Sequence, residues 1–355
     1  MILLGSTGSI GVNTLKVAKK HNIDVEVLVA GKSIELLNKQ IKEFRPKYVV
    51  VQDKDDVKDV CHDRVYHDGN GILEVLNKAK SNLVVNSLVG FAGLKPTLEA
   101  VKLGKKLALA NKESLVVGGE FIDTTNITPI DSEHFGLWYL MGDKKVSSMT
   151  ITASGGSFRD TPLDKLKTVT VKEALNHPNW SMGKKITIDS ATMVNKLFEL
   201  LEARWLFDTD KIDALIETKS IIHALINFVD GSTTAHIAGV DMKLPISYAV
   251  LDRVDDEVLK PVDLLEVGSL EFRKIEEDRY PIWSIKEQIL KNPHLGVVIN
   301  AANEVAIEKF FAKELGFLGI SDTILKAFKK FEDTKANSTE ELFEIDKEVR
   351  KFCNF

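Results

Sequence analysis

The sequence predicts an α/β protein whose N-terminal part is a Rossmann-like, doubly wound parallel sheet. A short apolar run at residues 2–4 leads directly into the glycine-rich segment GSTGSIG at 5–11, and a helical pattern follows over 12–21. Further short apolar segments then alternate with helical patterns. Because strands that alternate with helices form parallel sheets, these observations favour an open α/β domain at the start of the chain.

The composition limits the classes of protein that the chain can belong to. Its 355 residues suffice for two or three domains, and 44% hydrophobic with 28% charged residues is ordinary for a globular protein. A net charge of −5 argues against nucleic acid as the main partner. The two cysteines, Cys61 and Cys353, favour a reducing, cytoplasmic compartment. No apolar run reaches the roughly 18 residues of a membrane span, so no membrane partner is expected.

The glycine-rich segment has the parts of a dinucleotide-binding unit. Glycines let the backbone approach a pyrophosphate, and the start of the following helix supplies free N–H groups. The spacing is GxxGxxG and not the more usual GxGxxG, so a plain tight turn is the alternative. After a second predicted strand, at 25–30, stand Gly31, Lys32 and Ser33, where NAD sites usually carry an acidic residue. A lysine and a hydroxyl favour the 2′-phosphate of NADP(H), with a solvated Lys32 as the alternative.

Later strands extend the predicted sheet at 48–51, 83–86 and 107–110. Ligands of such sheets bind beyond the carboxyl ends of the strands. Lys112 comes directly after the last of these strands, so it is placed to reach a nicotinamide or a substrate. The loop GFAG at 90–93 either approaches the cofactor or needs an unusual φ.

Two carboxylates flank a serine at the end of a further strand, in Asp131, Ser132 and Glu133. Acidic residues and serine are common at helix starts, so capping alone is one interpretation. Two carboxylates at a strand end also suit a hard metal ion. With Glu199 they would offer three oxygen ligands to Mg²⁺ or Mn²⁺.

The polar stretch at 177–199 predicts the substrate site. Its first part, HPNWSMG at 177–183, indicates a loop, and residues 186–189 indicate a short strand because β-branched residues dominate them. Ser190 or Thr192 would then cap a helix.

On that helix, Asn195, Lys196 and Glu199 are spaced so that their side chains share one face. An amide, an ammonium and a carboxylate together suit a phosphate or polyol with a divalent metal. The alternative is an exposed helix with one Lys–Glu pair.

Strand patterns at 146–152, 212–217 and 233–237 could join residues 186–189 in one mixed or antiparallel sheet. One face would carry helices, and the other would be free for a second subunit in a homodimer. The segment at about 154–184 is predicted to be a mobile flap, because it has glycines near residue 155 at one end and Trp180 at its tip. A long ordered connection is the alternative.

From residue 281 onward helical patterns predict a C-terminal bundle, in which Ser338 and Glu341 would form a capping box. The expected division is therefore a cofactor domain at 1–130, a catalytic domain at 131–254, a linker at 255–280 and a helical domain at 281–355.

Seven motifs occur in order along nearly the whole chain. They are GSTGSIG at 5–11, LANKESL at 109–115, DSEH at 131–134, SGG at 154–156, HPNWSMG at 177–183, DSATM at 189–193 with the following Asn195, Lys196 and Glu199, and NAANE at 300–304. Together they resemble the 1-deoxy-D-xylulose 5-phosphate reductoisomerase family of the non-mevalonate isoprenoid pathway. The resemblance implies an enzyme that uses NADPH and Mg²⁺ or Mn²⁺. Such an enzyme rearranges its ketose phosphate and reduces the aldehyde to 2-C-methyl-D-erythritol 4-phosphate.

The resemblance also implies roles for individual residues. The metal ligands would be Asp131, Glu133 and Glu199. The substrate would be bound by Lys112, Ser132, Glu133, Ser154, His177, Trp180, Ser190, Asn195, Lys196 and Glu199. NADPH would be bound by Thr7, Gly8, Ser9, Ile10, Gly31, Lys32, Ser33, Asn111, Glu113, Met182 and Gly183. Catalysis is expected to involve Lys112, Glu133, His177 and Lys196.

Two other functions compete with this interpretation. An NADP-dependent dehydrogenase could act on another metal-chelating substrate without rearranging its skeleton. A nucleotide-binding regulatory protein could carry a dead active site. The intact set of Asp131, Glu133, Lys196 and Glu199 argues against the regulatory protein.

Overall fold

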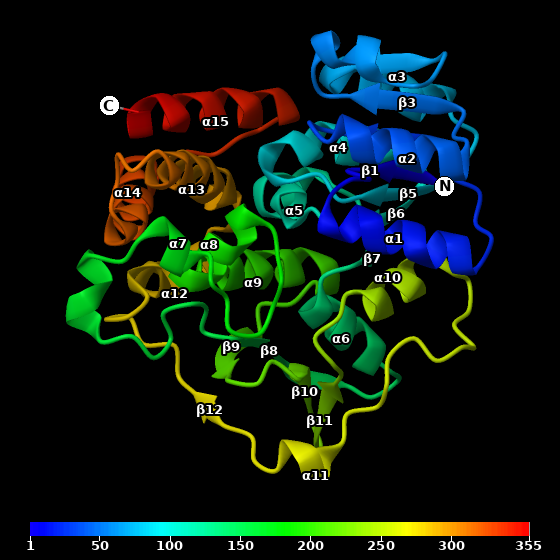
Figure 1. Ribbon diagram of the computed structural model, residues 1–355. Coiled ribbons are helices and arrows are strands. Elements are labelled where there is room, and N and C mark those ends of the chain that lie inside the picture. Colours follow the sequence, from blue (N-terminus) through cyan, green and yellow to red (C-terminus); the bar gives the residue numbers. More distant parts are fainter. Residues whose placement is uncertain (355) are drawn as a thin grey trace. The chain divides into compact units, whose positions relative to one another are not determined.

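The computed structural model describes residues 1–354, which form two compact units (Figure 1). The first unit contains Met1–Ser114, Ile122–Phe135 and Asp241–Leu259. The second contains the rest of the described chain. Each unit thus draws on separated stretches of sequence.

The first unit is built on a seven-stranded sheet in which every pairing is parallel, in the order β4-β3-β2-β1-β5-β6-β7. The strands are β1 (Ile2–Leu4), β2 (Val27–Ala30), β3 (Tyr48–Val51), β4 (Val65–His67), β5 (Leu83–Asn86), β6 (Lys106–Leu109) and β7 (Ile127–Pro129). The chain winds outward from β1 in both directions, and doubly wound sheets bind ligands where the order reverses. The predicted Rossmann-like class is confirmed; β4 was not predicted.

The helices of this unit pack apolar stripes onto a sheet buried on both faces. They are α1 (Ser9–Lys20), α2 (Ile34–Phe44), α3 (Asp68–Lys78), α4 (Leu94–Lys102) and α10 (Lys243–Val250), with short helical turns η1 (Lys54–Asp59) and η2 (Gly90–Gly93). Leu3, Leu28 and Val49 on the central strands are completely buried, as parallel sheets require. α10 comes from much later in the chain and packs against α1.

The second unit contains a mixed five-stranded sheet in the order β11-β10-β8-β9-β12. Its strands are β8 (Val146–Ala153), β9 (Ile212–Glu217), β10 (Ile222–Phe228), β11 (Thr233–Ile237) and β12 (Phe272–Arg273). The strands predicted at 146–152, 212–217 and 233–237 are confirmed. β10 was missed, although it pairs with both β8 and β11, because it is buried along most of its length and does not alternate clearly.

The strand predicted at 186–189 is wrong, because these residues belong to the helix α8 (Lys184–Thr192). The Thr187 hydroxyl donates to the Gly183 carbonyl at 2.8 Å, which satisfies the side chain inside a helix. Lys185 and Asp189 form an ion pair of 2.8 Å one helical turn apart. These local contacts outweigh the strand preference of the β-branched residues.

The predicted caps are also wrong. Ser190 and Thr192 lie within α8, and the next helix, α9 (Val194–Phe207), begins after Met193. Met193 adopts a left-handed conformation with φ 70°, and it has no capping side-chain bond. The break between the two helices is therefore made by the backbone of one buried methionine.

The remaining elements are helical, as predicted for the C-terminal part. They are α5 (Lys112–Gly118), η3 (Gly119–Phe121), α6 (Ser132–Leu140), η4 (Leu163–Lys167), α7 (Val171–Ala174), α11 (Leu264–Val267), η5 (Pro281–Ile285), α12 (Lys286–Lys291), η6 (Pro293–Leu295), α13 (Gly296–Phe311), α14 (Phe317–Lys330) and α15 (Thr339–Asn354). The almost wholly buried α13 packs against α14 and α15. Among residues 1–354, no helix is long and apolar enough to cross a membrane.

Only half of the predicted capping box at α15 forms. The Glu341 N–H donates to the Ser338 hydroxyl at 3.3 Å. The Glu341 carboxylate instead accepts from the Asn337 N–H at 2.7 Å. The helix start is thus capped, but the Glu341 carboxylate accepts from the Asn337 N–H and not from the expected Ser338 N–H.

Candidate active site

Most of the polar residues that were predicted to bind ligands in the first unit follow its parallel strands. Residues 7–10 follow β1, residues 31–33 follow β2, residues 111–113 follow β6 and residues 131–133 follow β7. Since all seven strands run in the same direction, these segments lie at one edge of the sheet. Tertiary structure therefore gathers residues that are more than 100 positions apart in the sequence.

The glycine-rich loop after β1 packs closely against α1 and leaves the start of that helix without a side-chain cap. A Cβ atom on Gly11 would lie 2.2 Å from the Gly5 carbonyl oxygen, so α1 packs directly on the loop. The first turn of α1 carries no acidic residue, and Gly8 at its N-cap offers no side chain to occupy the N–H groups. These free donors suit an anion.

Asn111 holds the loop at 90–93 in place. Its side chain is almost completely buried and donates to the carbonyls of Leu88 and Gly90, both at 2.9 Å. The unusual φ expected in this loop occurs at Gly90, at 71°. The Asn111 side chain therefore serves the fold, its main-chain N–H donates to the Asn86 carbonyl at 3.1 Å, and its contact with NADPH stays a prediction.

Asp131 is engaged on two sides. Its Oδ2 atom lies 2.7 Å from Lys112 Nζ, and its Oδ1 atom accepts from the Glu133 N–H at 3.1 Å. The capping interpretation is therefore correct for Asp131 at the start of α6, but it does not account for the buried ammonium beside the carboxylate. Ser132 donates its hydroxyl hydrogen bond to Glu133 at 2.6 Å.

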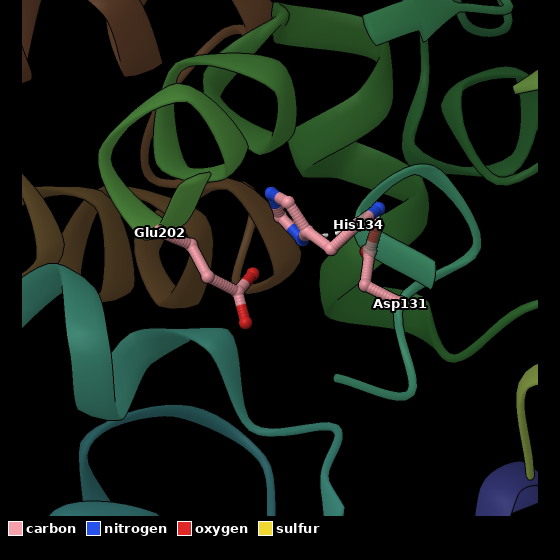
Figure 2. Close-up of side chains that lie close together, drawn as sticks. All are labelled: Asp131, His134 and Glu202. Atoms are coloured by element: carbon pink, nitrogen blue, oxygen red, sulfur yellow. Dashed lines mark hydrogen bonds and ion pairs between the residues drawn. The ribbon is translucent and has the colours of Figure 1, made fainter. Parts of the chain in front are cut away.

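His134 and Glu202 are two further buried side chains of types that can bind a metal, and neither was predicted as a ligand from the sequence. Figure 2 shows His134 beside Asp131, with 3.4 Å between His134 Nδ1 and Asp131 Oδ1, and it also draws Glu202, which projects from α9. His134 and Glu202 are almost completely buried. The signals were present, since His134 completes the DSEH motif and Glu202 lies three residues after Glu199.

In the second unit, His177 links three separate elements. Its Nε2 atom lies 2.8 Å from the Ser154 hydroxyl, at the end of β8, and 3.3 Å from the Ser190 hydroxyl on α8. Gly156, with φ 68°, leaves no room for a Cβ atom against α8, which keeps the glycine turn close to Ser190. The three predicted substrate residues of this group are thus brought together.

The tautomer of His177 follows from its other ring nitrogen. Nδ1 accepts from the N–H groups of Asn179 at 3.1 Å and Trp180 at 2.9 Å, so it carries no proton. The neutral ring must then carry its proton on Nε2 and donate to Ser154. Burial, with a smaller contribution from Arg159, lowers the pKa of His177 to about 4. His177 is accordingly a hydrogen-bond donor and not a general base.

We expect the protonation state of His177 to stay constant from about pH 8 to about pH 5. Its neutral form is favoured in the folded chain, so its contribution to stability is present above the unfolded pKa near 6.5 and is lost as the pH falls toward 4. NMR titration of the ring should show no midpoint in this window, and His177→Gln should lower activity without changing the shape of the pH profile. A midpoint near 6.5 would contradict the buried donor.

The polar side chains of α9 share one face, as predicted. Asn195 donates to one Glu199 oxygen at 2.5 Å, and the Lys196 ammonium pairs with the other. Lys196 and Glu199 are 4% and 1% exposed, so the exposed-helix alternative is wrong. A buried ion pair is seldom retained for stability alone, because desolvation offsets its attraction.

The HPNWSMG segment is a loop, as predicted. Asn179 anchors it by donating to the Thr218 carbonyl at 3.0 Å and to the Ser220 hydroxyl at 2.7 Å. Trp180 packs edge-on against His223 of β10, with 6.2 Å between ring centroids. His223 was missed together with its strand, and the mobility of the flap stays a prediction.

Comparisons with known proteins place the chain in a family. Models described as 1-deoxy-D-xylulose 5-phosphate reductoisomerase, its C-terminal domain and the DXP reductoisomerase C-terminal domain match residues 1–119, 127–207 and 237–352. The reductoisomerase of Nautilia profundicola is 61% identical over 361 residues, which cover 99% of both chains. That of Helicobacter pylori is 51% identical and covers 99% of this chain and 98% of its own.

Solved structures agree with the sequence comparisons. A DOX-P reductoisomerase in complex with NADPH, fosmidomycin and magnesium has a TM-score of 0.93 at 33% identity, covering 99% of this chain and 97% of its own. The Zymomonas mobilis enzyme in complex with NADPH has a TM-score of 0.88 at 31% identity, with the same coverage. Since both sequence and fold match over nearly their full length, the chain belongs to the 1-deoxy-D-xylulose 5-phosphate reductoisomerase family.

Proposed function

We propose that this chain uses NADPH and a divalent metal to convert 1-deoxy-D-xylulose 5-phosphate into 2-C-methyl-D-erythritol 4-phosphate, a step of isoprenoid precursor synthesis. The observation that carries the proposal is the buried, charged cluster of Asn195, Lys196 and Glu199 in a chain that matches the family over its length. A helix that only supports the fold has no need of such a cluster.

Asp131, Glu133 and Glu199 are the proposed metal ligands. All three offer carboxylate oxygens, the donor type that Mg²⁺ and Mn²⁺ prefer, and solved relatives contain magnesium. A divalent cation held there would make the hydroxyketone more acidic by drawing charge from its oxygens. Glu133, which also accepts a hydrogen bond from the Ser132 hydroxyl, is the proposed proton-transfer group among these residues.

The residues of the second unit orient the substrate. The hydroxyls of Ser154 and Ser190 and the Nε2–H of His177 can all donate to a phosphate dianion. From α9, Lys196 adds a positive charge that would attract the phosphate, and the Asn195 amide adds a further hydrogen-bond donor. Trp180 excludes water from the reacting carbons. Lys112, which belongs to the first unit, is the remaining proposed ligand of a substrate oxygen. Fixed donors of this kind lower the entropy that must be lost on reaching the reacting geometry.

NADPH supplies the hydride that reduces the rearranged aldehyde. Its pyrophosphate would lie on the N–H groups of Thr7, Ser9 and Ile10, and its 2′-phosphate would be bound by Lys32 and Ser33 after β2. Gly31, Glu113, Met182 and Gly183 complete the proposed cofactor contacts. The two related structures that contain NADPH support this choice of cofactor.

Lys32→Ala should raise the KM for NADPH much more than the KM for NADH, because only NADPH presents the 2′-phosphate. Expressed as binding free energy, the loss for NADPH should exceed the loss for NADH by about 1–3 kcal/mol, as for a hydrogen bond to a charged group. Lys42→Ala, an equivalent loss of an exposed lysine from α2, is the control and should leave both values alone. An unchanged preference between the cofactors in Lys32→Ala would remove this assignment.

We also propose that the chain works as a cytoplasmic homodimer that pairs through the sheet of the second unit. Exposed apolar side chains support this, since Ile237 on β11 and Phe272 on β12 are 39% and 47% exposed at opposite edges of that sheet. The free cysteines Cys61 and Cys353 favour the reducing compartment. A monomeric mass by light scattering at micromolar concentration would contradict the dimer.

The function is tested by incubating the purified chain with 1-deoxy-D-xylulose 5-phosphate, NADPH and Mg²⁺ or Mn²⁺. NMR of the product should show a branched carbon skeleton, which requires rearrangement as well as reduction. Reduction to an unbranched product would favour a simple dehydrogenase. NADPH that stays unoxidised with each metal would indicate a regulatory protein.

A further inference from the structure

Gln40 is a buried amide that links α2 to the glycine-rich loop. It is 5% exposed, and its Nε2 atom donates to the carbonyl of the fully buried Ser6 at 2.9 Å. Within residues 1–354 its Oε1 atom has no protein partner. Burying an amide for one hydrogen bond is unfavourable compared with an apolar side chain of similar size. A role in orienting the backbone of the glycine-rich loop therefore explains the glutamine better than a contribution to folding stability.

Other bonds hold the loop on either side of this contact. The Gly5 and Ser6 N–H groups donate to the Val29 carbonyl at 2.9 and 2.8 Å, and the Gly8 N–H donates to the Gly5 carbonyl at 3.1 Å. The peptide unit between Ser6 and Thr7 has no such backbone bond within the described residues. Among residues 1–354, Gln40 thus supplies the hydrogen bond that fixes the orientation of this peptide unit.

Fixing the carbonyl also fixes the N–H on the other side of the same peptide. A planar trans peptide points its C=O and N–H in opposite directions. With the Ser6 carbonyl held against α2, the half-buried Thr7 directs its N–H away from α2. Thr7 directly precedes Gly8, the N-cap of α1, whose neighbouring N–H groups have no side-chain cap. A reversed peptide would present a carbonyl dipole of the wrong sign to an anion there.

We infer that Gln40 is a positioning residue for the cofactor pyrophosphate, acting through the Thr7 N–H; this rests on the proposed use of NADPH. The helix that carries Gln40 begins directly after Lys32 and Ser33. α2 therefore connects the proposed 2′-phosphate contact at its start with the pyrophosphate loop through its second turn. Gln40 itself does not touch the cofactor.

Gln40→Met tests the inference, because methionine is similar in size and has no donor. NADPH binding, followed by its fluorescence, should weaken about 10-fold, which corresponds to about 1.4 kcal/mol. Adenosine 2′-monophosphate has the 2′-phosphate but no pyrophosphate, so its affinity should not change. Asn77→Leu on α3 is the matched control: it loses amide bonds to the Leu73 carbonyl and Glu99, and it should bind both ligands normally.

Gln40→Glu provides a second variant that is reversible within one folded protein. Its carboxylate cannot donate at about pH 8, whereas its protonated form can, so NADPH affinity relative to wild type should recover toward about pH 5.5. Equal NADPH binding by wild type and both variants would overturn the role of Gln40. So would equal weakening of both ligands in Gln40→Met, which indicates general damage. If the wild type binds neither ligand, the cofactor proposal itself fails.

Discussion

Replacing Asp131, Glu133 or Glu199 by its neutral amide should reduce kcat by about 10²–10³-fold, as for other groups that stabilise developing charge. Each change removes a negative charge but keeps the size of the side chain. If the three carboxylates hold one cation, part of the lost activity should return at high Mn²⁺ concentration. Activity measured against Mn²⁺ for Asp131→Asn, Glu133→Gln and Glu199→Gln, with thermal melts alongside, tests this.

The chain offers a matched control for the capping role of Asp131. Asp263 caps α11 by accepting from the Leu265 and Glu266 N–H groups, at 2.8 and 3.3 Å. Asparagine is about as good a cap as aspartate, so Asp263→Asn should change stability and turnover little. Near-normal turnover in one of the three active-site variants would remove that residue from the metal site. Near-normal turnover in all three would overturn the metal-dependent mechanism.

Lys196→Met should have the second large effect, on both substrate binding and stability. It removes the ammonium proposed to bind the phosphate, so kcat/KM should fall by about 10²-fold, the upper end for one charged hydrogen bond. It also leaves the buried Glu199 without its cationic partner, which typically destabilises a protein by about 3–5 kcal/mol. Steady-state kinetics and thermal unfolding measure the two effects separately.

Metal binding connects the two effects. In the wild type a cation at Glu199 must compete with Lys196, whereas in Lys196→Met it would neutralise an unpaired carboxylate. Saturating Mn²⁺ should therefore raise the melting temperature of Lys196→Met by more than that of the wild type. Lys185→Met, which breaks the partly buried pair with Asp189, should lose stability without this extra gain. An equal Mn²⁺ effect in all three proteins would argue that Glu199 is not a ligand.

The nucleotide-binding fold could be predicted because its signals are local. A parallel strand buried on both faces is a short apolar run, and the runs at 48–51 and 83–86 coincide with β3 and β5. Gly5 and Gly11 of the glycine-rich segment make close backbone contacts that leave no space for a side chain. Similarly, Asn195, Lys196 and Glu199 could be grouped from helical spacing alone.

The second unit was harder to predict, because its signals conflict. Residues 186–189 are β-branched, yet side-chain bonds such as Thr187 to Gly183 and the Lys185–Asp189 pair fit them into α8. β10 carries His223 in a strand that is largely buried, so it shows no clear alternation. Propensity is a weak preference that packing and local hydrogen bonds readily outweigh.

The sequence by itself determined the class of fold, the kinds of polar group available and the loop that contains His177. Tertiary structure decided what those groups can do. The Nε2–H tautomer and low pKa of His177 depend on burial and on two backbone N–H groups. The orientation of the Ser6 carbonyl depends on Gln40, which is 34 residues away. Hydrogen bonds and desolvation act through space at a few ångströms, so sequence spacing does not reveal them.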